Sequence, residues 1–184
     1  MAIEKYTTTC LVVESFPQGE NDRVYKLFTR EFGMVTAHAK SIRKLESKLR
    51  AHVLPRNLSL VTLVQGREVW RLVGAQELES PPEIIHEVTV LVRRFIRGEG
   101  AHKALYDRLI MFLDSSSKYD VQKLRLLLYF IILVELGYAD AKVIGVKDMK
   151  EYSSWSVDDL YTHLLLSHDV VRKHTQLVLQ EMQM

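Results

Sequence analysis

The sequence predicts an α+β protein in which a closed five-stranded β-barrel precedes an α-helical domain. Two observations carry this prediction. Up to about residue 80, apolar side chains alternate in short runs separated by turns rich in Gly and Pro, which is typical of β-strands. Beyond it, to the end of the 184-residue chain, they recur with the 3.6-residue period of α-helices. This change of period predicts two domains, residues 1–80 and 81–184.

The strand-like segments are short and are joined by recognisable turns. They span residues 6–15, 23–31, 34–40, 57–64 and 68–77. Residues 16–19, with the sequence Phe-Pro-Gln-Gly, are expected to form the first turn, and Gly33 supplies the positive φ of the second. Five short strands in about eighty residues favour a small closed barrel, and the oligonucleotide-binding (OB) fold is the commonest five-stranded form with a basic, aromatic-bearing groove.

Three features of this half bear on packing. In residues 34–40 the alternation places Val35, Ala37 and Ala39 inward. Cys10 is the only cysteine, which excludes an internal disulfide and a cysteine-based zinc site, and a small buried hydrophobe is the favoured reading over a reactive thiol. Residues 41–52 have no settled period, so a flexible loop and a short helix both remain open.

Helical signals begin at residues 80–83, Ser-Pro-Pro-Glu. Ser80 can cap a helix, Pro81 fits its first position and Glu83 completes a capping box. That helix is expected to end near residue 97, and a second spans about 101–113. A third is apolar nearly all round and ends at Gly137, which predicts the buried centre of the helical domain. After an ill-defined connector, residues 138–155, a capped start at Ser156 precedes helices over residues 157–166 and 168–182.

The sequence offers no site for enzymatic chemistry. It has no glycine-rich phosphate loop, no nucleophile motif and no histidine pair at metal-ligand spacing. Asp158 and Asp159 are adjacent, so on a helix they point about 100° apart and are better explained as charges favourable to the helix dipole. We therefore expect no enzymatic activity and no cofactor. No apolar run of membrane-spanning length and no signal-like start is present, so a cytoplasmic, nucleoid-associated protein without membrane contact is expected.

Positive charge is concentrated in one part of the chain. Residues 23–71 hold eleven Lys or Arg against three Glu, a net charge of +8 in a chain whose total is +2. Such a cluster is typical of a surface that binds a polyanion, although basic residues on strands also serve solubility. We predict DNA-binding roles for nine of its members: Arg23, Lys26, Arg30, Lys40, Arg43, Lys44, Lys48, Arg50 and Arg71.

Two further groups have competing explanations. Tyr25 and Trp70 could stack on bases, but both residue types are more often found in a core. Arg93, Arg94 and Arg97 end the first predicted helix, where basic side chains complement the helix dipole. The functional alternative for these three arginines is a contact with an acidic partner peptide.

The motifs of the first half resemble the N-terminal barrel of the RecO family of bacterial recombination mediators. The resemblance lies in three runs: Gly-Glu-Asn-Asp-Arg at 19–23, Phe-Thr-Arg-Glu-Phe-Gly-Met-Val at 28–35 and Ala-His-Ala-Lys-Ser-Ile-Arg at 37–43. That family shows the pattern G-E-x-D-R-x-x-x-L-T-x-x-x-G-x-x-x-x-x-A-K-G. The segment 124–138, which closes with Leu-Gly-Tyr, is similar to the family's central helix.

The resemblance implies an OB-fold barrel that binds single- and double-stranded DNA and anneals complementary strands. It also implies cooperation with RecR and the single-stranded DNA-binding protein in loading RecA, without nucleotide hydrolysis. By position, the basic residues from Arg23 to Lys44 would lie on the DNA-binding surface, whereas Gly19, Asp22 and Gly33 look structural.

Three departures from the family pattern stand out. The chain is shorter than is usual in the family, and the whole difference in length lies in the helical half. Residues 138–155 lack the four cysteines that bind zinc in many members, so no zinc is expected, and Ser41 replaces the glycine of A-K-G. The shortening bears on partner contacts more than on DNA binding. The competing hypothesis is an OB-fold adaptor whose basic face binds an acidic protein, such as the tail of a single-stranded DNA-binding protein.

Overall fold

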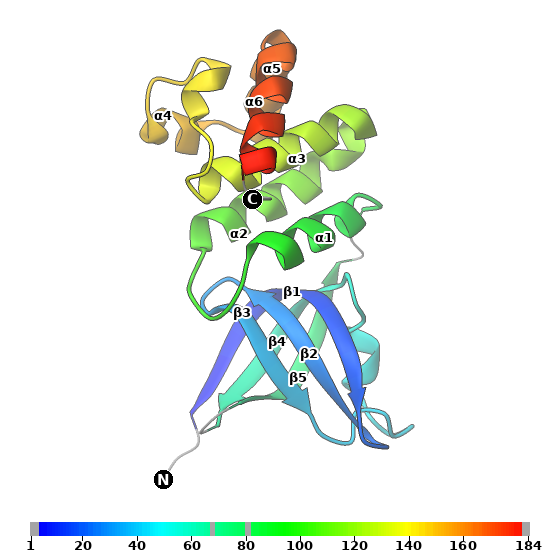
Figure 1. Ribbon diagram of the computed structural model, residues 1–184. Coiled ribbons are helices and arrows are strands. Elements are labelled where there is room, and N and C mark those ends of the chain that lie inside the picture. The colour runs from blue at the N-terminus through cyan, green and yellow to red at the C-terminus, as the bar shows by residue number, and fades with distance from the viewer. Residues whose placement is uncertain (1–3, 67–68, 80–81, 182–184) are drawn as a thin grey trace. The chain divides into compact units, whose positions relative to one another are not determined.

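The computed structural model describes residues 4–66, 69–79 and 82–181. Five strands come first along the chain and helices follow, which confirms the predicted fold class (Figure 1). The strands are β1 (Lys5–Gln18), β2 (Asp22–Thr29), β3 (Gly33–Ala39), β4 (Leu58–Gln65) and β5 (Trp70–Glu79), with a 3-10 turn η1 (Arg50–His52) before β4. The helices are α1 (Ile85–Phe95), α2 (Lys103–Ser115), α3 (Val121–Glu135), α4 (Met149–Ser154), α5 (Val157–Leu166) and α6 (His168–Glu181), with 3-10 turns η2 (Ser116–Lys118) and η3 (Ala141–Ile144).

The chain divides into two compact units, Met1–Tyr106 and Asp107–Met184. The first unit contains the five strands and also α1 with the segment that follows it. The change from strands to helices falls after Glu79, close to the expected position, but the first unit continues beyond it. A functional division at residue 80 therefore stays a prediction.

The strands close into a barrel in the order β1-β2-β3-β5-β4. Neighbours pair antiparallel except β3 and β5, which are parallel. β1 is long enough to pair with β4 through Lys5–Leu11 and with β2 through Cys10–Gln18. A register shift between Val12 and Glu14 marks a β-bulge in β1, a device that bends a strand around a barrel. This strand order and pairing are those of an OB fold.

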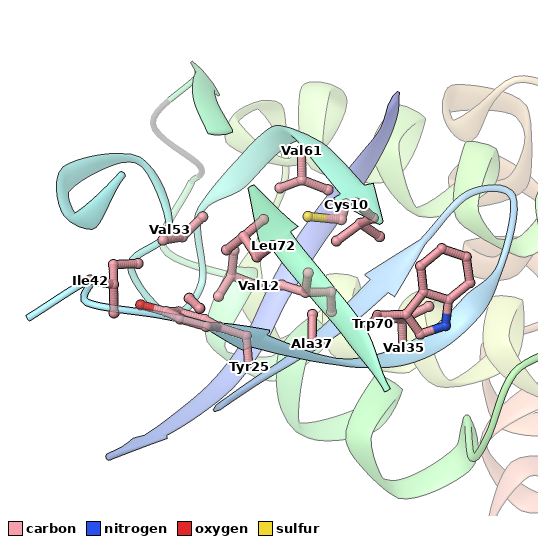
Figure 2. Close-up of a cluster of buried hydrophobic side chains, with 13 residues drawn as sticks. Cys10, Val12, Tyr25, Val35, Ala37, Ile42, Val53, Val61, Trp70 and Leu72 are labelled. Carbon is pink, nitrogen blue, oxygen red and sulfur yellow. The ribbon is translucent and has the colours of Figure 1, made fainter. Parts of the chain in front are cut away.

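The barrel core is built from the inward side chains (Figure 2). Val35, Ala37 and Ala39 are fully buried, as the alternation predicts, and so is Cys10. Burial raises the pKa of the Cys10 thiol far above its usual range, which keeps it protonated and inert. Tyr25 and Trp70 are only 2% and 4% exposed, so the suggestion that they stack on bases is wrong and the core explanation is confirmed.

One end of this core is sealed by the segment after α1. Trp70 contacts the rings of Tyr6 and Phe32, with centroids 5.7 and 5.0 Å away, and its Nε1 donates a hydrogen bond of 2.9 Å to Glu99 Oε1. Gly33 bridges to Glu99 with φ +71°, and a Cβ there would lie 2.1 Å from the carbonyl oxygen of Gly100. Position 33 therefore needs glycine for the turn and for this close approach.

Two local predictions are wrong. Phe16 and Pro17 belong to β1, and the turn comprises residues 19–21. Beyond Leu11, β1 pairs with β2 alone, and proline is tolerated in such an edge segment.

The first helix begins at Ile85 after Ile84, with no side-chain cap, so Glu83 precedes it. Ser80 and Pro81, the other members of the expected capping box, lie outside the described residues.

The helical unit follows the sequence pattern more closely. α3 is buried over most of its length, and Gly137 after it has φ +78°. Ser156 and Asp159 form the expected capping box of α5. The connector at residues 138–155 is ordered as η3 and α4, whose first backbone N–H groups are capped by the side chains of Asp140 and Asp148. Aspartate is among the best N-cap residues, which accounts for these two short elements.

Candidate nucleic-acid interface

The strand register places one row of side chains across the outer face of the barrel. Phe16 of β1 pairs with Val24 of β2, Val24 with His38 of β3, and His38 with Arg71 of β5. These side chains point away from the core, because the alternate positions Tyr25 and Ala37 point into it. Residues paired across strands are side-chain neighbours. An aromatic ring, an imidazole and a guanidinium are therefore presented in line on one surface.

Phe16 is the exposed aromatic side chain of this row. It is 46% exposed, and Lys26 Nζ lies 5.9 Å from its ring centroid. The sequence did not indicate this residue as functional, because Pro17 and Gly19 favour a turn around it. The bulge after Val12 also shifts the alternation, so that Phe16 rather than Ser15 faces outward. An exposed ring beside a cation is suited to stacking on a nucleobase.

A first basic hollow lies beside this row, between β2, β3 and the end of α1. It measures about 410 Å³, and its lining includes Lys26, Arg93 and Arg97. Glu14 joins two of these cations, with Oε1 2.8 Å from Lys26 Nζ and Oε2 3.3 Å from Arg93 Nη1. Burial acts to raise the pKa of Glu14, but Lys26 and Arg93 outweigh it and leave that pKa below its usual range. Glu14 therefore stays ionised and holds the two cations in place.

A second basic hollow lies where the β1–β2 hairpin meets the segment after β3. This pocket measures about 350 Å³, and its lining includes Arg23, Arg43 and Arg50. Arg23 Nη2 donates to Ser15 Oγ at 2.9 Å, and Arg43 Nη1 donates to the carbonyl oxygen of Gly19 at 3.2 Å. Tyr25, Ile42 and Val53 of the core line the same pocket and lie together in Figure 2.

The segment after β3 is docked onto the β1–β2 turn over residues 41–43. Ser41 adopts φ +54°, and its N–H donates to Asp22 Oδ1 at 2.6 Å. The Arg43 N–H donates to the carbonyl oxygen of Asn21 at 2.9 Å, and Ile42 between them is fully buried. The conformation left open for residues 41–52 is thus a set of turns ending in η1.

The remaining predicted residues fall into two sets. Lys40, Lys44 and Lys48 are exposed along residues 40–48, and Arg71 is exposed in the outer row. Arg30 is not part of either hollow and pairs with its neighbour Glu31 at 3.2 Å. Arg94 lies over the ring of Phe95, 5.4 Å from its centroid, apart from Arg93 and Arg97. The structure thus joins two arginines assigned to a partner peptide with a lysine assigned to DNA.

Among residues 4–66, 69–79 and 82–181, no three His, Cys, Asp or Glu side chains are grouped to hold a metal ion. Within the same ranges no helix combines the length and apolarity needed to cross a membrane.

This chain is similar to proteins of one family. A family model described as "Recombination protein O N terminal" matches residues 1–80. A DNA repair protein RecO of Dehalococcoides mccartyi is 28% identical over 143 residues, which cover 72% of this chain and 56% of that protein. RecO of Heliobacterium modesticaldum is 39% identical over 75 residues, covering 41% of this chain and 28% of the relative. RecO of Acaryochloris marina is 36% identical over 86 residues, which cover 47% of this chain and 29% of that protein.

The most extended of these matches covers 72% of this chain but only about half of the relative's length. Residues 1–80, which the family model matches, contain the five strands, the segment after β3 and all residues of the outer row. Residues 1–80 of this chain thus match the N-terminal domain of the RecO family.

Proposed function

We propose that this protein binds DNA in recombinational repair and anneals complementary strands. The observation that carries the proposal is the outer row with its exposed Phe16, together with one basic hollow beside that row and a second where the β1–β2 hairpin meets the segment after β3. The relatives' shared description as DNA repair proteins supports the same process. In OB folds the face of strands 2 and 3 is the usual site of oligonucleotide binding, and the outer row crosses these strands.

The two kinds of group on this face have separate roles. Lysine and arginine contact phosphates and release condensed counterions, which gives affinity without sequence preference. Phe16 adds base stacking, which accepts any base because every base has a π-face. Annealing follows if the basic surface lowers the repulsion between two strands while it leaves their base edges free to pair.

The family relationship supports a wider role as a second part of the proposal. The protein would assist RecA loading together with RecR and the single-stranded DNA-binding protein, and it would bind double-stranded as well as single-stranded DNA. No catalytic chemistry is required for these steps, because binding energy alone holds the strands. The competing adaptor function differs in one respect, since its basic face would serve an acidic protein instead of DNA.

A triple charge reversal separates the two functions. Lys40, Arg43 and Lys44 are exposed and close together in the segment after β3, so their replacement by Glu should lower DNA affinity about 100-fold or more. The matched control reverses Lys142, Lys150 and Lys173, which are exposed in the helical unit. Fluorescence anisotropy with a labelled single strand gives the affinity, and thermal unfolding shows whether each variant is folded.

The outcomes differ sharply. Loss of binding in the barrel variant, with the control unchanged, supports DNA as the ligand of this face. Equal affinity of the folded barrel variant and the wild type would overturn the assignment and favour the adaptor. A strand-annealing assay on the same proteins then tests whether annealing falls in proportion to binding.

A further inference from the structure

The pocket lined by Arg23, Arg43 and Arg50 differs from an ordinary basic surface. Its three guanidinium groups come from three separate segments, namely β2, the docked segment after β3 and η1. The residues that line it include no carboxylate. The first hollow, by contrast, contains cations that Glu14 already pairs. Three arginines that line one pocket with no carboxylate in its lining are suited to more than one negative charge.

Two of the arginines are held before any ligand binds. Ser15 fixes Arg23 and the carbonyl oxygen of Gly19 fixes Arg43, so little side-chain freedom remains to be lost on binding. Tyr25 also lines the pocket, and burial raises the pKa of its hydroxyl group, which is neutral and can donate a hydrogen bond.

The pocket also has an apolar wall. Ile42, Val53, Leu54 and Pro55 contribute to its lining, and Leu54 is 51% exposed. A volume of about 350 Å³ is at the lower end of the range for small-molecule sites, roughly 300–1,000 Å³. Such a space suits the end of one strand, with its phosphate among the arginines and its sugar against the wall.

We propose that this pocket binds the terminal phosphomonoester of a DNA strand, so that the protein distinguishes phosphorylated strand ends from internal positions. The inference rests on the proposed DNA-binding function and adds an end-binding site to it. A phosphomonoester carries about −1.5 to −2 charges at pH 7 and three free oxygens, whereas an internal phosphodiester carries one charge and two free oxygens. Three guanidinium groups, each with several donors, can satisfy the additional charge and oxygen.

The test compares short thymidine oligonucleotides that carry an internal fluorophore and differ only at their ends. One has a 5′-phosphate, one a 3′-phosphate, and one has hydroxyl groups at both ends. We expect wild-type protein to bind at least one phosphorylated strand about tenfold more tightly than the unphosphorylated strand, since an added charge-assisted hydrogen bond has about this value. Equal affinity for all three strands would overturn the inference and leave general DNA binding intact.

Two variants locate the effect. Arg50→Gln removes one guanidinium from the pocket, and Arg50 is exposed, so the fold should be unaffected. We expect this variant to lose the preference for phosphorylated ends. Lys48→Gln is the control, because Lys48 is exposed two residues away and is not part of the pocket lining. The Lys48→Gln variant should bind all three strands more weakly by the same factor. A preference for phosphorylated ends that survives in Arg50→Gln would contradict the assignment.

A direct titration keeps the result independent of strand binding. The mononucleotide 5′-dTMP and the nucleoside thymidine are titrated against isotope-labelled wild-type protein and Arg50→Gln by nuclear magnetic resonance. Shifts near Tyr25 with the mononucleotide alone, absent in the variant, support the pocket even if no oligonucleotide binds. If the mononucleotide binds but no oligonucleotide does, the phosphate site is retained and the proposed function is rejected. If 5′-dTMP causes no shifts, the phosphate site is rejected.

Discussion

Ser41 has a left-handed backbone, with φ +54°, at the position where the family pattern has glycine. The conformation is retained because Asp22 binds its N–H and Ile42 after it is buried. For a residue with a Cβ this region is unfavourable by roughly 1–2 kcal/mol. The departure from the family pattern therefore carries a local energetic cost.

Replacing Ser41 by Gly should stabilise the protein. Relief of the left-handed conformation exceeds the entropy that glycine adds to the unfolded chain, so we expect the free energy of unfolding to rise by about 0.5–1 kcal/mol. Urea denaturation measures the change. Lys40→Gly is the control, because Lys40 has no positive φ and the variant should be destabilised by about 0.5–1 kcal/mol. A Ser41→Gly protein that is less stable than wild type would contradict this account of the turn.

Phe16 allows stacking to be separated from charge. Phe16→Ala should weaken single-stranded DNA binding by about 1–3 kcal/mol while the dependence on salt stays the same, because no cation is removed. Its side chain is 46% exposed, so thermal stability should change little. Phe16→Tyr keeps an aromatic ring and should retain affinity. Unchanged affinity in Phe16→Ala would remove stacking on this ring from the mechanism.

At the scale of the element, α5 is started by a reciprocal cap. Ser156 Oγ accepts from the Asp159 N–H at 3.1 Å, and Asp159 Oδ2 accepts from the Ser156 N–H at 2.9 Å. Hydrogen bonds from the Ser156 side chain and backbone hold the pKa of Asp159 below its ordinary value of 3.8. The folded-state pKa is depressed, so the contribution of this carboxylate is present above the unfolded pKa and is lost as pH falls through the folded pKa.

The cap therefore predicts a pH-dependent difference between two proteins. Ser156→Ala should be less stable than wild type near neutral pH, and the gap in melting temperature should narrow as pH falls below about 4. A melting-temperature series from neutral to acid pH checks this, with Ser154→Ala, outside the box, as the control. A gap that stays constant through the acid range would show that Asp159 takes no part in the cap.

A second element-scale feature is the buried ion pair of the helical unit. Arg108 Nε lies 3.6 Å from Glu135 Oε1, and both side chains are under 10% exposed. The same guanidinium donates to the carbonyl oxygens of Tyr152 and Ser153, at 3.1 and 3.3 Å, and to that of Trp155. Arg108 thus joins α2, α3 and the end of α4, and the carbonyl groups left open by a short helix find a donor.

Removal of Arg108 should be among the most damaging single changes in the unit. Arg108→Ala leaves Glu135 buried without its partner and is expected to cost about 3–5 kcal/mol of unfolding free energy. Arg125→Ala, on the exposed face of α3, is the comparison and should cost far less. Chemical denaturation followed by circular dichroism measures both. A loss below about 1 kcal/mol for Arg108→Ala would mean that the pair is structurally dispensable.

Local patterns predicted most elements, and long-range contacts account for the misses. The alternation in β3, the glycine after α3 and the capping box of α5 are properties of adjacent residues, so they could be read directly. The position of Phe16 depends on a bulge in β1 and on its pairing with β2, which no local signal shows. Likewise, Arg93 and Arg97 are close to Lys26 only because α1 lies against the strands through Glu14.

At the scale of the whole molecule, function depends on where the charge is placed. The chain has a net charge of only +2, yet residues 23–71 carry +8, so attraction to a polyanion is directed to the barrel. The fold then divides these cations among two hollows, an exposed segment after β3 and the outer row. Eight of the nine predicted residues belong to one of these four places, and Arg30, which pairs with Glu31, lies outside them.

The most direct test of the account is the affinity for a single-stranded oligonucleotide, measured by fluorescence anisotropy over a series of salt concentrations. If the barrel neutralises four or more phosphates, the logarithm of the binding constant should fall against the logarithm of salt concentration with a slope of about −3 or steeper. Tight binding with that slope would confirm a DNA-binding face made of several basic residues. A slope near zero, or no binding at low salt, would contradict it.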